Sequence, residues 1–267
     1  MTIEEIKSKI LNLWNIIYQF TKREAIAKYK GSYLGFAWTF ITPLIMLIVY
    51  TFVFGQIFQS KWQVNSSNPM EFSLILFCGL TVYNIFSETI SRAPQLIITN
   101  VNYVKKVVFP LEIFPFVSLG SALVNGTVNF ILLLIFQLLI TGKLYWTLVL
   151  FPIVLLPLLI MIIGISWFLS SLGVFLRDIG YVITISIQAL MLLSPIFYPS
   201  TSVPDQFQWF FQINPIAYFV EAARAVVLFG EIPQIITYLK FLLSAILISF
   251  LGYWWFRRTK SGFSDVL

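Results

Sequence analysis

Apolar stretches separated by short polar turns dominate this chain. Six of them approach or exceed the roughly 20 mostly apolar residues that a helix needs to cross a bilayer. They are Leu34–Phe58, Phe72–Ile90, Ile113–Ile140, Tyr145–Leu176, Tyr181–Phe197 and Tyr238–Phe256. The pattern predicts an all-α integral membrane protein with six transmembrane helices.

The first 33 residues follow a different pattern. Apolar side chains recur at spacings of three and four from Ile3 to Phe20, and lysines such as Lys7 and Lys9 fall between them. An amphipathic helix of this kind lies in the headgroup plane, although a basic cytoplasmic terminus also serves as a simple anchor. We therefore divide the chain into an N-terminal cytoplasmic interface helix, residues 1–33, and a six-span transmembrane domain, residues 34–267.

Residues 198–237 are aromatic, rich in Pro and Gly, and too broken to form a span. We expect short re-entrant helices here, which dip into the membrane before the last span and return. Irregular backbone at membrane depth is tolerated only where protein or water covers it.

Composition agrees with a membrane protein, because 59% of the residues are hydrophobic and 10% are charged, whereas soluble proteins carry about 25% charged residues. Histidine is absent, so the commonest general base and metal ligand is missing. The single cysteine, Cys78, lies in an apolar run and excludes an intrachain disulfide. We expect no metal site.

The distribution of basic residues predicts the orientation. With six spans, thirteen of the 17 Lys and Arg residues fall on the side that holds both termini, and four fall on the other side. Cytoplasmic segments carry the excess of positive charge, so both termini should be cytoplasmic. The net charge of +6 is thereby explained by topology, and we expect no nucleic-acid partner.

The chain lacks the signature of an ATP-binding loop. Gly142-Lys143 resembles the end of that motif, but Leu144 replaces the required Ser or Thr, and Gln137 stands where the first Gly should be. We therefore expect no catalytic residues and no bound cofactor in this chain.

Two groups of polar residues lie within the predicted spans. Glu88 and Arg92 are four residues apart near the cytoplasmic end of the second span, which suits a helical ion pair; intramembrane charge is also a functional hypothesis. Asn125 and Asn129 share one face of the third span, where small and polar residues usually mark helix packing. We favour packing over substrate contact for the two asparagines.

Aromatic residues make up 18% of the chain. Belts at the membrane surface and lipid packing account for many membrane aromatics, but flat rings also form sliding surfaces for sugars. We take the following as candidate channel-lining aromatics: Trp38, Tyr50, Phe54, Tyr83, Phe86 and Trp167.

Four stretches together resemble the permease subunits of ATP-binding-cassette exporters of the O-antigen, capsule and teichoic-acid group. They cover nearly the whole chain in order: YKGSYLGFAWTFITPL (29–44), NVNYVKKVVFPLEIFP (100–115), FLRDIG (175–180) and SPIFYPSTSVPDQFQWFFQINPIAYFVEAARAVVLFGEIP (194–233). The nearest subgroup is the Wzm-like O-antigen permease, which acts in lipopolysaccharide biosynthesis.

The resemblance implies a transport subunit of the bacterial cytoplasmic (inner) membrane that forms a homodimer. Two copies of a separate ATPase would bind ATP and Mg, and the substrate would be a lipid-linked polysaccharide surrounded by membrane lipids. The segment 94–110 would be a coupling helix on the ATPase. Residues expected to contact the ATPase are Asn100, Tyr103, Lys105, Lys106, Arg177 and Asp178.

The resemblance also suggests two further groups. Residues 198–237 would form an outer gate, which a Glu221–Arg224 ion pair one helical turn apart could lock. Arg23, Lys28 and Lys30 lie at headgroup depth, where each cation attracts anionic groups by roughly 1 kcal/mol, and we expect them to attract the substrate's diphosphate. For Arg177 and Asp178, a local ion pair within the turn is an equal alternative.

Other functions remain open from the residues. Within the exporter class, the chain could move teichoic acid, capsule, drugs or lipids. An ion-coupled secondary transporter is a different class, but such proteins often show internal repeats, and we see none. An integral glycan-processing enzyme would need several polar catalytic groups at one membrane face, which this composition disfavours.

Overall fold

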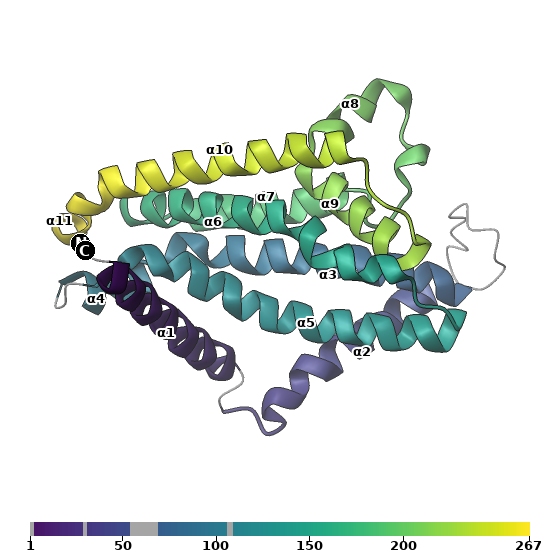
Figure 1. Ribbon diagram of the computed structural model, residues 1–267, viewed down its shortest axis with the longest axis horizontal. Coiled ribbons are helices and arrows are strands. Elements are labelled where there is room, and N and C mark those ends of the chain that lie inside the picture. Colours follow the sequence, from purple (N-terminus) through teal and green to yellow (C-terminus); the bar gives the residue numbers. More distant parts are fainter. Residues whose placement is uncertain (1–2, 29–30, 54–68, 106–108) are drawn as a thin grey trace.

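The computed structural model describes residues 3–28, 31–53, 69–105 and 109–267. These ranges contain helices and no strand, which confirms the predicted all-α class (Figure 1). The α-helices are α1 (Ile3–Ala27), α2 (Trp38–Tyr50), α3 (Pro69–Arg92), α4 (Val101–Lys105), α5 (Phe114–Thr141), α6 (Phe151–Phe175), α7 (Ile179–Leu193), α8 (Asp205–Ile213), α9 (Pro215–Arg224), α10 (Ile235–Thr259) and α11 (Phe263–Val266). Between them lie the 3₁₀-helices η1 (Gly35–Ala37), η3 (Ala93–Gln95), η4 (Ile98–Asn100), η5 (Leu111–Ile113), η6 (Trp146–Leu150), η7 (Ser200–Ser202) and η9 (Lys260–Gly262), and the π-helix η8 (Ala225–Phe229).

Within the described ranges, four helical stretches are long and apolar enough to cross a membrane. They are Met70–Gln95, Leu111–Thr141, Trp146–Phe175 and Ile235–Val266. These stretches coincide with the second, third, fourth and sixth spans expected from the sequence. Their positions follow directly from the apolar runs, because a helix buries all of its backbone hydrogen bonds within one segment.

The other two expected spans are shorter apolar helices, Trp38–Val53 and Ile179–Leu193. The end of the expected first span, residues 54–58, lies outside the described residues. Helix α7, which corresponds to the expected fifth span, ends at Leu193 because Pro195 follows. Ser194 is extended, with a ψ of 148°, as expected for a residue that precedes proline.

Helix α3 lies at the centre of the bundle. In its most apolar window 78% of the residues are buried, against 11% for the stretch that contains α10. Helices α5, α6, α7 and α9 all contact α3. Helix α10 runs beside α6 on the outer side (Figure 1). Side chains of α3 are therefore placed to reach most other elements.

One end of the bundle gathers α1, α4, α11 and both described ends of the chain (Figure 1). Phe20 of α1 packs there against Tyr103, Phe109 and Phe114, with ring centroids 5.5 to 6.4 Å away. The segment expected to be a coupling helix consists of η3, η4 and the short α4, and residues 106–108 lie outside the described ranges.

The opposite end carries the segment expected to form an outer gate. It folds as η7, α8, α9 and η8, so the short helices expected there are present. Asn214 begins α9 in a typical capping role, because its side-chain oxygen accepts hydrogen bonds from the amides of Ile216 and Ala217. Thr147 and Gln137 donate to the carbonyls of Val226 and Val227, at 2.6 and 2.8 Å. These bonds attach η8 to η6 and α5.

Candidate functional site

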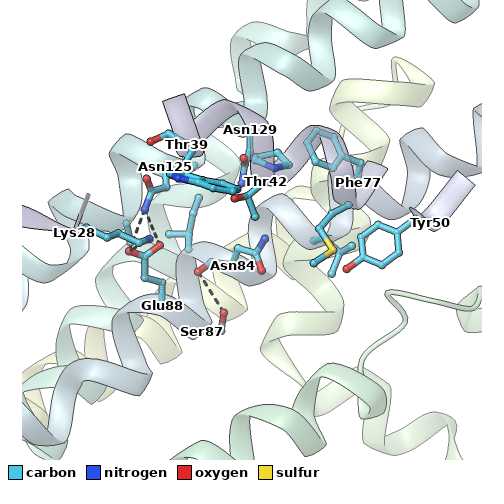
Figure 2. A pocket seen from close by; sticks show the side chains of 17 residues that line it. Lys28, Thr39, Thr42, Tyr50, Phe77, Asn84, Ser87, Glu88, Asn125 and Asn129 are labelled. Atoms are coloured by element: carbon cyan, nitrogen blue, oxygen red, sulfur yellow. Dashed lines mark hydrogen bonds and ion pairs between the residues drawn. The ribbon is translucent and has the colours of Figure 1, made fainter. Parts of the chain in front are cut away.

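A cavity of about 320 Å³ lies between α2, α3 and α5 (Figure 2). Lys28, which follows the last residue of α1, lies at one end of the cavity, and Tyr50 at the end of α2 lies toward the other. Its volume falls in the usual range of about 300–1,000 Å³ for small-molecule pockets. The walls combine apolar side chains with several amides and hydroxyls, and this mixture makes it the candidate site.

A charged cluster occupies the Lys28 end of the cavity. The Lys28 ammonium lies 3.2 Å from Glu88 Oε1. The Asn125 side-chain amide donates to both oxygens of the same carboxylate, at 3.1 and 2.9 Å. Figure 2 shows the three side chains converging from the turn after α1, from α5 and from α3. Charge-assisted bonds of this kind hold a partly buried carboxylate in place.

The expected Glu88–Arg92 ion pair is wrong. Glu88 pairs with Lys28, and Arg92 pairs with Glu24 of α1, with 2.6 Å between Nη1 and Oε1. The reason is that α1 packs on α5, which brings Glu24 and Lys28 within reach of the charged side chains of α3, so acids and bases meet between helices rather than along one helix. Burial raises the pKa of Glu24 above its ordinary value of 4.5, and nearby Arg92 partly opposes this shift.

Uncharged polar groups occupy the middle of the cavity. Asn129 has 8% of its surface exposed and Thr39 has 4%. The Thr39 hydroxyl is buried without a hydrogen-bond partner. Asn84 lies close by in Figure 2 and is exposed toward this space. Trp38 forms part of the wall, and its indole N–H donates to Ser32 Oγ at 2.9 Å.

The six aromatics considered for a channel are not brought together. Trp38 and Tyr50 line the cavity, while Phe54 lies outside the described residues. Tyr83, Phe86 and Trp167 are packed inside the bundle, with exposed fractions of 2%, 5% and 8%. Tyr83 donates to the carbonyl of Ile187, and Trp167 to that of Glu112. These three rings face the protein interior rather than a cavity.

Most residues expected to contact an ATPase lie at the α1–α4–α11 end of the bundle. Tyr103 is half-buried in the aromatic cluster of Phe20, and the Asn100 side chain donates to Leu96 O within its own segment. Lys105 is exposed, and Lys106 lies outside the described residues. Arg177 and Asp178 are exposed in the α6–α7 turn. No ion pair joins Arg177 or Asp178 to another described residue.

The three basic residues considered for diphosphate contact have different surroundings. The Arg23 guanidinium lies over the Phe20 ring, 4.4 Å from its centroid. Lys28 is engaged by Glu88. Lys30 lies outside the described residues.

The expected Glu221–Arg224 gate pair is also wrong. Arg224 is 3% exposed, and its guanidinium donates to the carbonyls of Ile75, Pro195 and Ile196 at 3.0, 2.6 and 2.8 Å. Glu221 is exposed on α9 and forms no ion pair with a described residue. The two side chains are near in sequence, but three buried carbonyls draw Arg224 into the bundle.

Sequence reasoning missed several polar groups around the cavity. Asn84 precedes Glu88 by one helical turn, so the spacing already placed both on one face of α3. Thr39 and Glu24 gave no such signal, because their partners or neighbours belong to distant segments. Among the residues that the structure describes, no three His, Cys, Asp or Glu side chains come together to hold a metal ion.

Comparisons with known proteins cover most of the chain. Residues 16–228 match the family model described as ABC-2 type transporter. The O-antigen export system permease protein RfbA of Klebsiella pneumoniae is 25% identical over 269 residues, which span 98% of this chain and 99% of that protein. RfbA of Myxococcus xanthus is 28% identical over 196 residues, spanning 72% of this chain and 71% of that protein.

A third similarity is to the polysialic acid transport protein KpsM of Escherichia coli. The two chains are 25% identical over 217 residues, which span 79% of this chain and 81% of KpsM. The family match extends from α1 through the π-helix η8, and therefore includes the cavity, its charged cluster and Arg224. This chain belongs to the ABC-2 type transporter family.

Proposed function

We propose that this chain is the transmembrane permease subunit of an ATP-driven exporter of lipid-linked polysaccharide in the bacterial inner membrane. The observation that carries the proposal is the end-to-end similarity to a protein named O-antigen export system permease. The four membrane-length helices agree with it. In this proposal α2 and α7 complete six spans, α1 lies at the cytoplasmic interface, and α8 and α9 re-enter the membrane from outside.

Hydrolysis of ATP takes place on a separate partner, because the sequence has no ATP-binding loop. The partner docks at the α1–α4–α11 end, where exposed Lys105, Arg177 and Asp178 are available for contact. Two copies of the permease assemble with two ATPase subunits. Helix α7 is available to contact a second copy of the chain, because it is apolar and none of its residues is buried.

The test is co-expression of the chain with the ABC ATPase encoded beside it, followed by purification through a tag on the permease alone. We expect a complex with two copies of each subunit whose ATPase activity requires both. Lipid-linked glycan should raise that activity. A permease that purifies alone, with no associating ATPase, would leave an ion-coupled transporter as the better explanation.

A matched pair of variants examines the docking end. Arg177→Ala combined with Asp178→Ala removes two exposed charges from the α6–α7 turn and should weaken ATPase association or stimulation. Lys143→Ala removes an exposed charge just after α5, at the other end of the bundle, and should change neither. Equal effects of the two variants would refute docking at the α6–α7 turn.

Arg23, Lys28 and Lys30 are proposed to attract the substrate's diphosphate to the headgroup region; because Lys28 is paired with Glu88, most of the attraction would come from Arg23 and Lys30. Near-surface cations favour anionic groups by roughly 1 kcal/mol each. Replacing all three with Gln should raise the concentration of lipid-linked glycan needed for half-maximal ATPase stimulation. Unchanged export and stimulation in that variant would remove this role.

The similarity to a polysialic acid transport protein favours a second candidate, export of an acidic capsule glycan. The two candidates differ in the glycan that stimulates the purified complex. Stimulation by a polyprenyl-linked O-antigen and not by polysialic acid would favour the first, and the reverse result the second.

A further inference from the structure

We propose that the cavity between α2, α3 and α5 is a binding subsite for one neutral, hydroxyl-rich sugar unit of the exported glycan. Each chain then carries its own sugar subsite. This inference rests on the proposed function, and names the class of ligand and the place where it binds. Five features of the cavity support it.

The first is the set of polar side chains that border the cavity. Asn129 is 8% exposed and lines the cavity. The Thr39 hydroxyl also lines it, and it is buried without a hydrogen-bond partner. Because buried polar groups are almost always hydrogen-bonded, the Thr39 hydroxyl requires a ligand or water in the cavity.

The chemistry of these groups matches hydroxyls. A carboxamide offers both a donor and an acceptor, and a Thr hydroxyl does the same. Asn84, Asn129 and Thr39 therefore form a set that suits a ligand whose groups also donate and accept. Sugar hydroxyls have this property, whereas a lipid acyl chain would leave every one of these groups unsatisfied.

The third feature is the charge of the cavity. Among the described residues that line it, Lys28 and Glu88 are the charged ones, and they neutralise one another across 3.2 Å. The Asn125 side-chain amide also donates hydrogen bonds to both oxygens of the Glu88 carboxylate. A phosphate could form an ion pair with Lys28 only if the Lys28–Glu88 ion pair were broken first. The site therefore favours a neutral ligand over the anionic part of a lipid-linked substrate.

The fourth feature is the apolar part of the wall. Trp38 and Tyr50 line the cavity from the start and the end of α2, and Phe77 lines it from α3; Figure 2 shows Tyr50 and Phe77 on the same side of the cavity. Sugar rings carry C–H groups on their faces, and flat aromatic rings pack against these faces while amides bind the hydroxyls. The combination of a few placed polar groups and aromatic walls is typical of small-molecule sites.

The fifth feature is position. The lining residues of α3 run from Phe77 to Glu88, a rise of about 16 Å along a helix. The cavity therefore lies alongside a membrane-length helix rather than beside a surface loop. The residues that line the cavity are supplied by one chain, so an exporter with two chains holds two such subsites.

A single-cysteine accessibility assay tests the proposal. Cys78 is the only cysteine of the sequence and is 1% exposed, so a Cys78→Ala background isolates one new thiol. Asn129→Cys reports on the cavity, and Leu139→Cys is the control, because Leu139 is on the same helix with 74% of its surface exposed. The reagent is a small neutral methanethiosulfonate, applied to the complex of permease and ATPase.

Three probes distinguish the ligand classes: a neutral oligosaccharide cut from the exported glycan, a polyprenyl diphosphate without sugar, and buffer alone. We expect the oligosaccharide to slow modification at position 129 at least about tenfold and to leave position 139 unchanged. The sugar-free lipid should protect neither. Equal protection of position 129 by the sugar-free lipid would overturn the proposal, because the cavity would then bind the carrier.

A second measurement covers the case in which the cysteine itself disturbs the cavity. Asn129→Leu keeps a similar volume and removes the carboxamide, and should raise the oligosaccharide concentration for half-maximal ATPase stimulation about tenfold. Asn129→Gln keeps the carboxamide and should restore part of that loss. Equal behaviour of the Leu and Gln variants would overturn the role of the amide.

The failure of this inference is distinct from the failure of the proposed function. If lipid-linked glycan stimulates the complex but the oligosaccharide protects neither position, the sugar subsite is elsewhere and this inference alone falls. If no glycan stimulates any complex, the exporter function falls, and the subsite falls with it.

Discussion

Arg224 joins three segments that are far apart in the sequence. Its guanidinium donates to carbonyls of Ile75 in α3 and of Pro195 and Ile196 after α7. Gly79 leaves room for it, because a side-chain carbon at that position would lie 2.7 Å from Arg224 Nη2. The planar, multiply donating guanidinium suits this arrangement, and a Lys ammonium does not reproduce it.

Arg224→Gln should strongly destabilise the protein, whereas Glu221→Gln should have little effect. Each buried carbonyl left without its donor costs about 1–3 kcal/mol, while Glu221 is exposed. Thermal unfolding of the two variants in detergent measures the difference. Equal losses would restore the Glu221–Arg224 gate pair that the sequence spacing suggested.

The ion pairs between α1 and α3 give a second prediction at the residue scale. In a double-mutant cycle, Lys28→Gln and Glu88→Gln should be non-additive, while Arg92→Gln and Glu88→Gln should be additive. Partly exposed pairs contribute about 0.2–1 kcal/mol, so the coupling should be small but measurable in the unfolding temperature. Coupling between positions 88 and 92 instead would favour the pair within α3.

The same residues show why the site could not be read from the sequence. Spacing along one helix predicted Glu88–Arg92 and Glu221–Arg224, but both Arg side chains found partners on other elements. The pairing of Asn125 with Glu88 crosses from α5 to α3. Local periodicity identifies which residues share a face, and only the packing of helices decides what that face meets.

At the scale of elements, prediction was more successful, because apolar length determines membrane-length helices with little help from tertiary contacts. The second, third, fourth and sixth expected spans correspond to α3, α5, α6 and α10, with boundaries that differ by at most six residues. The early end of α7 depended on Pro195, a signal that the apolar count alone ignored.

The close approach of α6 and α10 allows a prediction about the stability of the protein at this scale. A side-chain carbon added to Gly252 would lie 2.0 Å from the Gly164 carbonyl oxygen, so the two helices pack backbone against backbone. Small residues at such crossings are typical of membrane helices. Gly252→Ala should separate the helices and cost about 1–3 kcal/mol, as overpacking usually does.

The control for that variant is Leu251→Ala on the exposed side of α10, where 51% of the side chain's surface is accessible. Its unfolding temperature in detergent should stay near that of the unmodified protein. If Leu251→Ala loses as much as Gly252→Ala, the tight crossing does not limit stability.

At the scale of the whole molecule, the two ends of the bundle differ in character. One end collects α1, α4 and α11, and an ion pair at 2.9 Å joins Lys260 of η9, just after α10, to Glu112 of η5, just before α5. The other end carries α8, α9 and η8. The distribution of Lys and Arg assigns the first end to the cytoplasm, and this orientation is still a prediction.

Chemical labelling from outside the cell checks the orientation. In the Cys78→Ala background, Lys143→Cys should react with a membrane-impermeant maleimide on intact spheroplasts, because Lys143 follows α5 at the outer end. Ser264→Cys in α11 should react only after the membrane is permeabilised. Reaction of Ser264→Cys on intact spheroplasts would invert the topology.

The contacts of Arg224 also have a consequence for biogenesis. Ile75 precedes its guanidinium partner by 149 residues, so the ribosome must deliver most of the chain before that bond can form. This part of α3 therefore lacks its Arg224 hydrogen bond until α9 has been synthesised. A nascent chain truncated before residue 224 would be recognisable to quality-control proteases as unfinished, even after several of its helices had reached the bilayer.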